Sequence, residues 1–349
     1  MTNWLLYGAY GYTGELLAEE AVGRGHRPVL AGRDEARLRP LAERLGLEWV
    51  AVDLTDSQAL RKAINGVDLV MHAAGPFVFT SQPVVDACLA VGAHYLDITG
   101  EIPVFEAILG RDAEAKAAGI ALIPGVGFDV IPTDCMARYV AERLPDATHL
   151  ELAIASLSSI SPGTAKTMVE QLPGGTLARV DGLLTPIRMG SDVRRIRFLD
   201  RERTVMPIPW GDLATAYRTT GIPNIRTYMA FPRRMVSVMA ATAPVSNLLL
   251  RPAFVRRLIQ RVIGRTITGP DESLRTSGRS YVWAKAINAQ GHSVAAQLET
   301  LEGYRFTAVA GLNSVEALLA HPRAGALTPA QAFGADFVLA VPETRRVDG

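Results

Sequence analysis

The composition of this 349-residue chain is that of a folded protein, and its length suggests two domains at about 100–200 residues each. Apolar residues make up 48% of the chain and charged residues 20%, which excludes a disordered chain. The 36 basic and 35 acidic residues nearly cancel, so we expect no nucleic-acid partner. Two isolated cysteines, Cys88 and Cys135, fit buried core positions better than disulfides or a metal site. With neither a signal peptide nor a spanning apolar run evident, we expect a cytoplasmic protein.

Short apolar strands alternate with helical patterns along the first 130 residues. Strands are predicted at Trp4–Tyr7, Pro28–Ala31, Trp49–Val52, Leu69–Ala73, His94–Ile98 and Ile120–Pro124. Helices are predicted between them at Tyr12–Arg24, Glu35–Leu45, Ser57–Ile64, Gln82–Val91 and Pro103–Ala118. This alternation predicts an α/β Rossmann domain, with a doubly wound parallel sheet, over residues 1–132.

The pattern changes after residue 132. One helix, Asp134–Leu144, precedes runs that alternate at period two, namely Leu150–Ala155, Val193–Phe198, Arg279–Asn288 and His292–Thr300. We therefore expect an inserted α+β domain with an antiparallel sheet over residues 133–305. A final apolar helix, Ala308–Leu319, leads us to expect that residues 306–349 return to the Rossmann domain.

A glycine motif, Gly8-Ala-Tyr-Gly11-Tyr-Thr-Gly14, lies between the first strand and the first helix. Glycines here permit a tight turn, close approach of the backbone to a pyrophosphate, and close packing of helix on strand. The helix amides then face the phosphates. We expect residues 8, 10–14 to bind a dinucleotide, with Tyr10, Tyr12 or both lining its nicotinamide side or serving only in packing.

The second strand ends in Ala31-Gly32-Arg33-Asp34. An acidic residue at this point would bind the ribose 2′-OH of NAD, whereas an arginine accommodates the 2′-phosphate of NADP. Arg33 therefore favours NADP over NAD, because a guanidinium can pair with a phosphate in a bidentate way. Asp34 fits better as the N-cap of the following helix.

Two later turns complete the predicted cofactor site. Asp53-Leu54 follows the third strand, where the carboxylate either reaches the adenine amine or caps the next helix. Ala73-Ala74-Gly75-Pro76 follows the fourth strand, where small residues let the cofactor approach the backbone.

The segments GAYGYTG, AGRD, HAAGPF, HYLDITGE and IPGVGFDVIPTD together resemble the saccharopine dehydrogenase-like superfamily, and most of all its trans-acting enoyl reductase branch. The resemblance is strong over residues 1–135 and loose beyond. It implies an NAD(P)-binding Rossmann domain, an inserted α+β domain and a cleft between them. Enoyl reductases of this branch reduce a C=C bond of an acyl chain, whereas saccharopine-type members reduce an imine.

Two turns at the carboxyl edge of the predicted sheet should face the nicotinamide, since ligands of open α/β sheets bind there. Gly127 and Phe128 lie in one of them and are expected to contact the cofactor. Thr99, Glu101 and Asp129 are candidates for orienting the substrate or relaying a proton, with Tyr10 as a further candidate. For Asp129, and for Asp97 in the first of these turns, the alternative is a helix cap or a hydrogen bond at a domain hinge.

Two other features invite a catalytic interpretation that we reject. Tyr281 and Lys285 have the Tyr-x-x-x-Lys spacing of short-chain dehydrogenases, but their segment alternates as a strand does, which would place them ~13 Å apart. His72 precedes the turn at residues 73–76, where a packed core histidine is the better interpretation.

Residues 247–265 combine apolar side chains with five arginines in the pattern of a basic amphipathic helix. It could contact a membrane or an acyl substrate, or bury its apolar face in the second domain or a homodimer. We expect an NADP(H)-dependent reductase of a C=C bond conjugated to a carbonyl, acting on a small-molecule or acyl substrate. A saccharopine-type imine reductase and a non-catalytic NADP-binding, lipid-associated scaffold are the alternatives.

Overall fold

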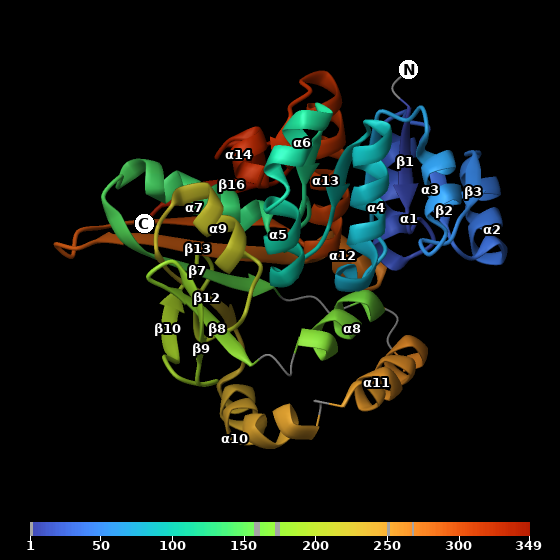
Figure 1. The fold of residues 1–349 in the computed structure, drawn as a ribbon. Coiled ribbons are helices and arrows are strands. Elements are labelled where there is room, and N and C mark those ends of the chain that lie inside the picture. Colours follow the sequence, from blue (N-terminus) through green and yellow to red (C-terminus); the bar gives the residue numbers. More distant parts are fainter. Residues whose placement is uncertain (1–2, 157–160, 172–174, 250–251, 267–268) are drawn as a thin grey trace. The chain divides into compact units, whose positions relative to one another are not determined.

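The computed structural model describes residues 3–156, 161–171, 175–249, 252–266 and 269–349. The chain divides into two compact units (Figure 1). Unit 1 comprises residues 1–131 and 304–333, and unit 2 comprises residues 132–303 and 334–349. The segment 306–349 is thus divided, because residues 334–349 belong to unit 2.

Unit 1 is built on a seven-stranded sheet in the order β15-β6-β5-β4-β1-β2-β3. Its strands are β1 (Trp4–Tyr7), β2 (Val29–Gly32), β3 (Trp49–Ala51), β4 (Leu69–His72), β5 (His94–Asp97), β6 (Ala121–Ile123) and β15 (Gly325–Ala326). Every pair is parallel. The strand order reverses between β1 and β4, which is the Rossmann arrangement, and the predicted fold class of this unit is confirmed.

The helices of unit 1 follow the strands as predicted. They are α1 (Tyr12–Gly23), α2 (Glu35–Leu45), α3 (Ser57–Ile64), α4 (Phe77–Val91), α5 (Ile102–Leu109), α6 (Asp112–Ala118), α13 (Gly303–Ala320) and α14 (Pro329–Phe333). Asp34 caps α2 by accepting from the amide of Arg37, as expected. The single helix expected at 103–118 is two helices, α5 and α6, separated at Gly110 and Arg111.

The core of unit 1 is formed by its central strands, whose side chains are buried on both faces of the sheet. Leu5, Leu6, Val70, Met71 and Leu96 are all inaccessible to solvent. A parallel sheet covered on both faces requires such continuous apolar strands. The sheet therefore holds the loops at its carboxyl edge on a rigid base.

Unit 2 is built on a second sheet in the order β10-β11-β12-β7-β13-β14-β16, with β8 joined to β12 and β9 to β8. Its strands are β7 (Ala147–Ser156), β8 (Thr176–Val180), β9 (Leu183–Ile187), β10 (Arg194–Arg197), β11 (Glu202–Pro207), β12 (Asn224–Ala230), β13 (Arg279–Asn288), β14 (Ser293–Leu301) and β16 (Arg345–Asp348). The expected antiparallel sheet is found, except that β7 and β12 run parallel, so the sheet is mixed. Period-two alternation reports which face is buried and not the direction of the strand.

The helices of unit 2 are α7 (Ile131–Arg143), α8 (Pro162–Gln171), α9 (Asp212–Thr220), α10 (Arg233–Leu249), α11 (Ala253–Thr266), α12 (Glu272–Ser277) and the 3₁₀ helix η2 (Phe337–Ala340). The prediction of one continuous helix at 247–265 is wrong. This range contains the end of α10 and most of α11, and its residues 250–251 lie outside the described part. Pro252 itself is not helical, which suits a residue that lacks an amide hydrogen. No helix among the described residues is long and apolar enough to cross a bilayer.

Two rejections made from the sequence are confirmed. Tyr281 and Lys285 both lie on β13, which pairs with β7 and β14, so they are not neighbours on a helix. His72, on β4, is fully buried. The two cysteines are likewise buried and free, as expected for core residues.

Candidate cofactor site

The glycine loop between β1 and α1 is held against the ends of two neighbouring strands. The amide of Gly8 donates to the carbonyl of Ala31 on β2 at 2.8 Å, and that of Gly11 donates to the carbonyl of Gly8 at 3.0 Å. A Cβ on Gly8 would lie 2.8 Å from the amide nitrogen of Ala74, and one on Gly14 only 2.2 Å from the carbonyl oxygen of Gly8. Only glycine fits these positions.

This loop fits the diphosphate of a dinucleotide. Helix α1 starts at Tyr12 after Gly11, and no side chain caps its first turn. Thr13 and the half-buried Gly11 lie at this helix start, where the helix dipole favours an anion. The start of α1 is therefore the part of unit 1 that can hold the phosphates.

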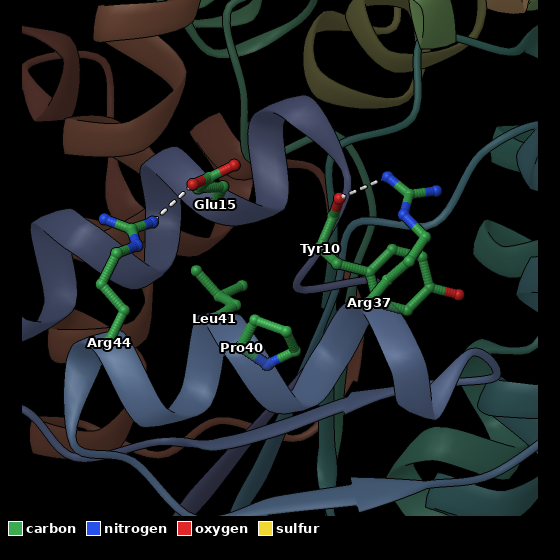
Figure 2. Close-up of a pocket in the computed structure, with 6 residues that line it drawn as sticks. All are labelled: Tyr10, Glu15, Arg37, Pro40, Leu41 and Arg44. Carbon is green, nitrogen blue, oxygen red and sulfur yellow. Dashed lines mark hydrogen bonds and ion pairs between the residues drawn. The ribbon is translucent and has the colours of Figure 1, made fainter.

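The end of β2 lies beside the glycine loop, and there Tyr10 of the loop and Arg37 of α2 form a stacked pair (Figure 2). The ring of Tyr10 covers Gly32, where an added Cβ would lie 2.4 Å from ring carbon Cε1. The guanidinium carbon of Arg37 lies 4.7 Å from the centre of this ring, and Arg37 Nη2 donates to the carbonyl of Tyr10 at 3.1 Å. Because β2 is on the adenosine side of a Rossmann sheet, this position of Tyr10 favours the packing role, which the sequence left open beside a place at the nicotinamide.

An open pocket of about 350 Å³ lies between α1 and α2, next to this pair (Figure 2). Tyr10 and Arg37 line one end, and Glu15 and Arg44 line the other, where they form an ion pair. Arg44 also pairs with Glu19 at 2.8 Å. Arg44 is thus neutralised by two carboxylates, whereas Arg37 contacts an aromatic ring and a carbonyl.

Arg33 follows β2 directly, and its side chain is exposed. Asp53, also exposed, follows β3 and accepts from the amide and hydroxyl of Thr55 at 2.9 and 2.8 Å. These two bonds, and to a lesser degree the charge of Arg33, lower the pKa of Asp53. The cap of α3 is Asp56 instead, which accepts from the amide of Ala59. Asp53 therefore closes its own turn beside Arg33, with Leu54 half-buried next to it.

The turn after β4 lies on the other side of the glycine loop. Ala73 and Ala74 are half-buried there, and Ala74 touches Gly8. The hydroxyl of Thr80 donates to the carbonyl of Ala74 at 2.6 Å, and Gly75 is exposed. This turn is fixed from both sides, and its small residues through Pro76 leave the backbone accessible.

Glu101 caps helix α4, which follows the turn after β4. Its two carboxylate oxygens accept from the amides of Phe77 and Val78 at 2.7 and 2.9 Å, and only 3% of its surface is exposed. The carboxylate therefore satisfies two amides in the first turn of α4. The amide of Glu101 donates to the hydroxyl of Thr99 at 3.1 Å, so both predicted residues are engaged in holding this loop.

A buried hydrogen-bond network joins the loops after β5 and β6. Asp97 Oδ1 accepts from the amides of Thr99 and Gly125 at 2.9 and 2.8 Å, and its Oδ2 accepts from the hydroxyl of Tyr95 at 2.7 Å. The Tyr95 oxygen in turn lies 3.1 Å from Nδ1 of His72. Burial raises the pKa of Asp97 to about 6 and lowers that of His72 to about 3.

The loop after β6 carries the remaining predicted residues. The amide of Phe128 donates to the hydroxyl of Thr307 on α13 at 3.0 Å, and an added Cβ on Gly127 would lie 3.0 Å from Thr307 Cγ2. The carboxylate of Asp129 lies against Gly100, where a Cβ would be 2.9 Å from its Oδ2. Burial raises the pKa of Asp129 to about 6.

The structure thus brings the predicted residues to one edge of the unit 1 sheet, in two groups. The group predicted to bind the phosphates and adenosine lies around β1, β2 and β3, and the second group lies at the ends of β4, β5 and β6. The ring of Tyr12 lies in neither group. It packs edge-on against the ring of Tyr304, with 5.0 Å between the ring centres. Sequence reasoning missed Arg37, although this residue, four positions after Arg33, could have been noticed as a second cation.

The comparisons with known proteins agree with this geometry. Residues 4–123 match the family of saccharopine dehydrogenase NADP binding domains. The fold of the whole chain is similar to that of saccharopine dehydrogenase (L-Glu forming) from Saccharomyces cerevisiae, with a TM-score of 0.67, 13% identity and full coverage of both chains.

Two curated relatives have telling names. The chain is 30% identical over 183 residues to a trans-acting enoyl reductase of Mycobacterium bovis, covering 48% of this chain and 44% of the relative. It is 25% identical over 224 residues to a lipid droplet localized protein of Caenorhabditis elegans, covering 58% and 53%. The chain spans about half the length of these relatives. The resemblance seen in the sequence is confirmed over residues 4–123, which match the saccharopine dehydrogenase NADP binding domain family.

Proposed function

We propose that this chain is an NADP(H)-dependent oxidoreductase. The observation that carries the cofactor proposal is the pair of arginines at the end of β2 and the start of α2. Arg33 is exposed there, Arg37 is held over Tyr10, and no carboxylate occupies position 32 or 33 to accept the 2′-OH of NAD. Two guanidinium groups at this point suit a 2′-phosphate. We assign Tyr10 to cofactor binding on this ground, and not to proton transfer.

The proposed reaction is reduction of a C=C bond conjugated to a carbonyl, with the nicotinamide cofactor supplying the hydride. The name of the mycobacterial relatives supports it. Within the chain, Asp129 is the proposed proton donor, because a pKa of about 6 leaves a protonated fraction near neutral pH. Thr99 and Glu101 are proposed to act by positioning, since their side chains hold the loop that passes Asp129.

The proposed substrate is apolar, such as an acyl chain. Val78 and Phe79 follow Gly75 at the start of α4, and 43% and 65% of their surfaces are exposed. Exposed apolar side chains beside a cofactor site favour an apolar ligand. The name of the lipid droplet relative agrees with a lipid-like substrate.

The test is oxidation of NADPH by the full chain with an α,β-unsaturated acyl thioester, with the product identified by mass spectrometry. We expect a product heavier by two hydrogens, and less of it with Phe79→Ser than with Leu183→Ser, a change of an exposed residue on β9. Turnover only with a mixture of an amino acid and a keto acid would establish the imine reductase instead. Tight NADPH binding without either activity would establish the scaffold.

A further inference from the structure

The basic residues of this chain are concentrated in one segment. Residues 213–270 contain nine arginines and not one aspartate or glutamate. The rest of the chain therefore carries 27 basic residues against 35 acidic ones. A chain that is nearly neutral as a whole thus has a strongly cationic segment, and this segment includes α10 and α11.

Helix α11 presents apolar side chains to solvent within that segment. Phe254, Leu258 and Val262 are 73%, 59% and 54% exposed. Their spacing of four residues places them along one stripe of the helix, since each step advances by about 40° beyond one full turn. Arg257 and Arg261 are exposed and border the same stripe at the (i, i+3) positions of Phe254 and Leu258.

The side of α11 next to this stripe is engaged within unit 2. Val255, Ile259 and Ile263 are half-buried there, and Gln260 Nε2 donates to the carbonyl of Lys166 on α8 at 3.4 Å. The exposed stripe therefore widens the apolar face of the helix beyond the side by which it joins its unit. A soluble surface helix ordinarily carries a single apolar stripe.

The start of α10 repeats the pattern. Met235 and Val238 are 48% and 60% exposed, and Arg233 and Arg234 beside them are exposed as well. Exposed apolar residues bordered by arginine thus occur on two successive helices of the acid-free segment.

We propose that α11 docks on an anionic lipid surface, with Phe254, Leu258 and Val262 inserted among the lipids and Arg257 and Arg261 at the phosphate level. Helices that lie in a membrane interface combine an apolar stripe with bordering cations in this way. A second copy of the chain fits less well, because a symmetric contact through this stripe would bring the arginines of two copies together without acidic partners on the helix. Nucleic acid would leave the apolar stripe in water.

The test is co-sedimentation of the full chain with vesicles of phosphatidylcholine alone or mixed with phosphatidylserine. We expect binding to the anionic vesicles that weakens with added salt. The variant Phe254→Ser/Leu258→Ser/Val262→Ser should lose it. The variant Arg257→Gln/Arg261→Gln should bind roughly 30-fold more weakly, at about fivefold for each charge. Leu183→Ser, which changes an equally exposed residue on β9, is the control and should bind as the wild type does.

Three results would overturn the proposal. One is wild-type protein that stays in the supernatant with anionic vesicles, and another is sedimentation that the stripe variant retains. The third is a dimer in light scattering that the stripe variant converts to monomer, since the stripe would then be an interface between copies. Urea unfolding of the same variants shows that unit 2 is folded, and their NADPH affinity separates this proposal from that of the cofactor.

Discussion

Two glycines of unit 1 share a left-handed backbone but differ in their surroundings. Gly8 has φ +87° and Gly25 has φ +83°, yet a Cβ on Gly8 would meet the backbone of Ala74 whereas one on Gly25 would meet nothing within 4 Å. Substituting alanine at Gly25 therefore costs only the strain of the backbone, about 1 kcal/mol. Gly8→Ala should be clearly more destabilising in urea unfolding and should abolish NADPH binding. Equal losses in both variants would show that the contact with Ala74 is unimportant.

Asp129 should make the stability of the fold depend on pH. Its pKa is raised to about 6 in the folded state, so between about pH 4 and 6 the folded chain binds more protons than the unfolded chain. Stability therefore falls as pH rises through this window, by up to about 3 kcal/mol from this group. Asp129→Asn should remove that part of the slope in urea unfolding at a series of pH values.

The control is Asp53→Asn, which should change the slope of stability against pH in the direction opposite to Asp129→Asn. Asp53 is exposed and its pKa is lowered, so its contribution is present at neutral pH and is lost on acidification. Matching slopes in the wild type and Asp129→Asn would mean that this carboxyl titrates alike in the folded and unfolded states.

Single residues differ in how far the sequence reveals them. The place of Arg33 could be predicted because the motif fixes it at the end of β2. The role of Glu101 could not, because its partners, the amides of Phe77 and Val78, are 24 and 23 residues away along the chain. The sequence likewise could not reveal that Arg37, on α2, stacks on the ring of Tyr10 in the glycine loop. Contacts between distant segments are set by packing, on which local pattern carries no information.

At the scale of elements, α4 depends on a cap that comes from another loop. Glu101→Gln leaves one carbonyl oxygen for two amides, so one buried amide loses its acceptor. We expect a loss of about 1–3 kcal/mol in the free energy of unfolding, measured in urea. The exposed Glu48 provides the matched substitution, and Glu48→Gln should have little effect. A cost below that of the control would rule out this capping role.

Element boundaries were predictable where local signals are complete. The helices at 35–45 and 57–64 begin after a capping aspartate, and both have the predicted bounds. Helix α4 begins at Phe77 and not at Gln82, because its cap lies outside the segment and Pro83 is accommodated within the helix. Direction is harder still, and the parallel pairing of β7 with β12 follows from the route of the chain between them.

At the scale of the whole molecule, the last strand belongs to unit 2. β16 pairs with β14, Asp348 accepts from the hydroxyl of Tyr139 at 2.7 Å, and the guanidinium carbon of Arg346 lies 3.4 Å from the centre of that ring. Removing residues 345–349 should therefore lower the stability of unit 2 in urea while leaving NADPH affinity unchanged. Loss of NADPH binding in the shortened chain would contradict this separation of roles.

The most direct test of the account is titration of NADPH and NADH, followed by fluorescence, on the wild type and on Arg33→Ala and Arg37→Ala. We predict that NADPH binds more tightly than NADH, and that each substitution weakens NADPH by about 1–3 kcal/mol with little effect on NADH. Arg323→Ala, an exposed arginine between α13 and the edge strand β15, is the control. Equal affinity for the two cofactors, or no loss in either variant, would contradict the assignment of the end of β2 to the 2′-phosphate.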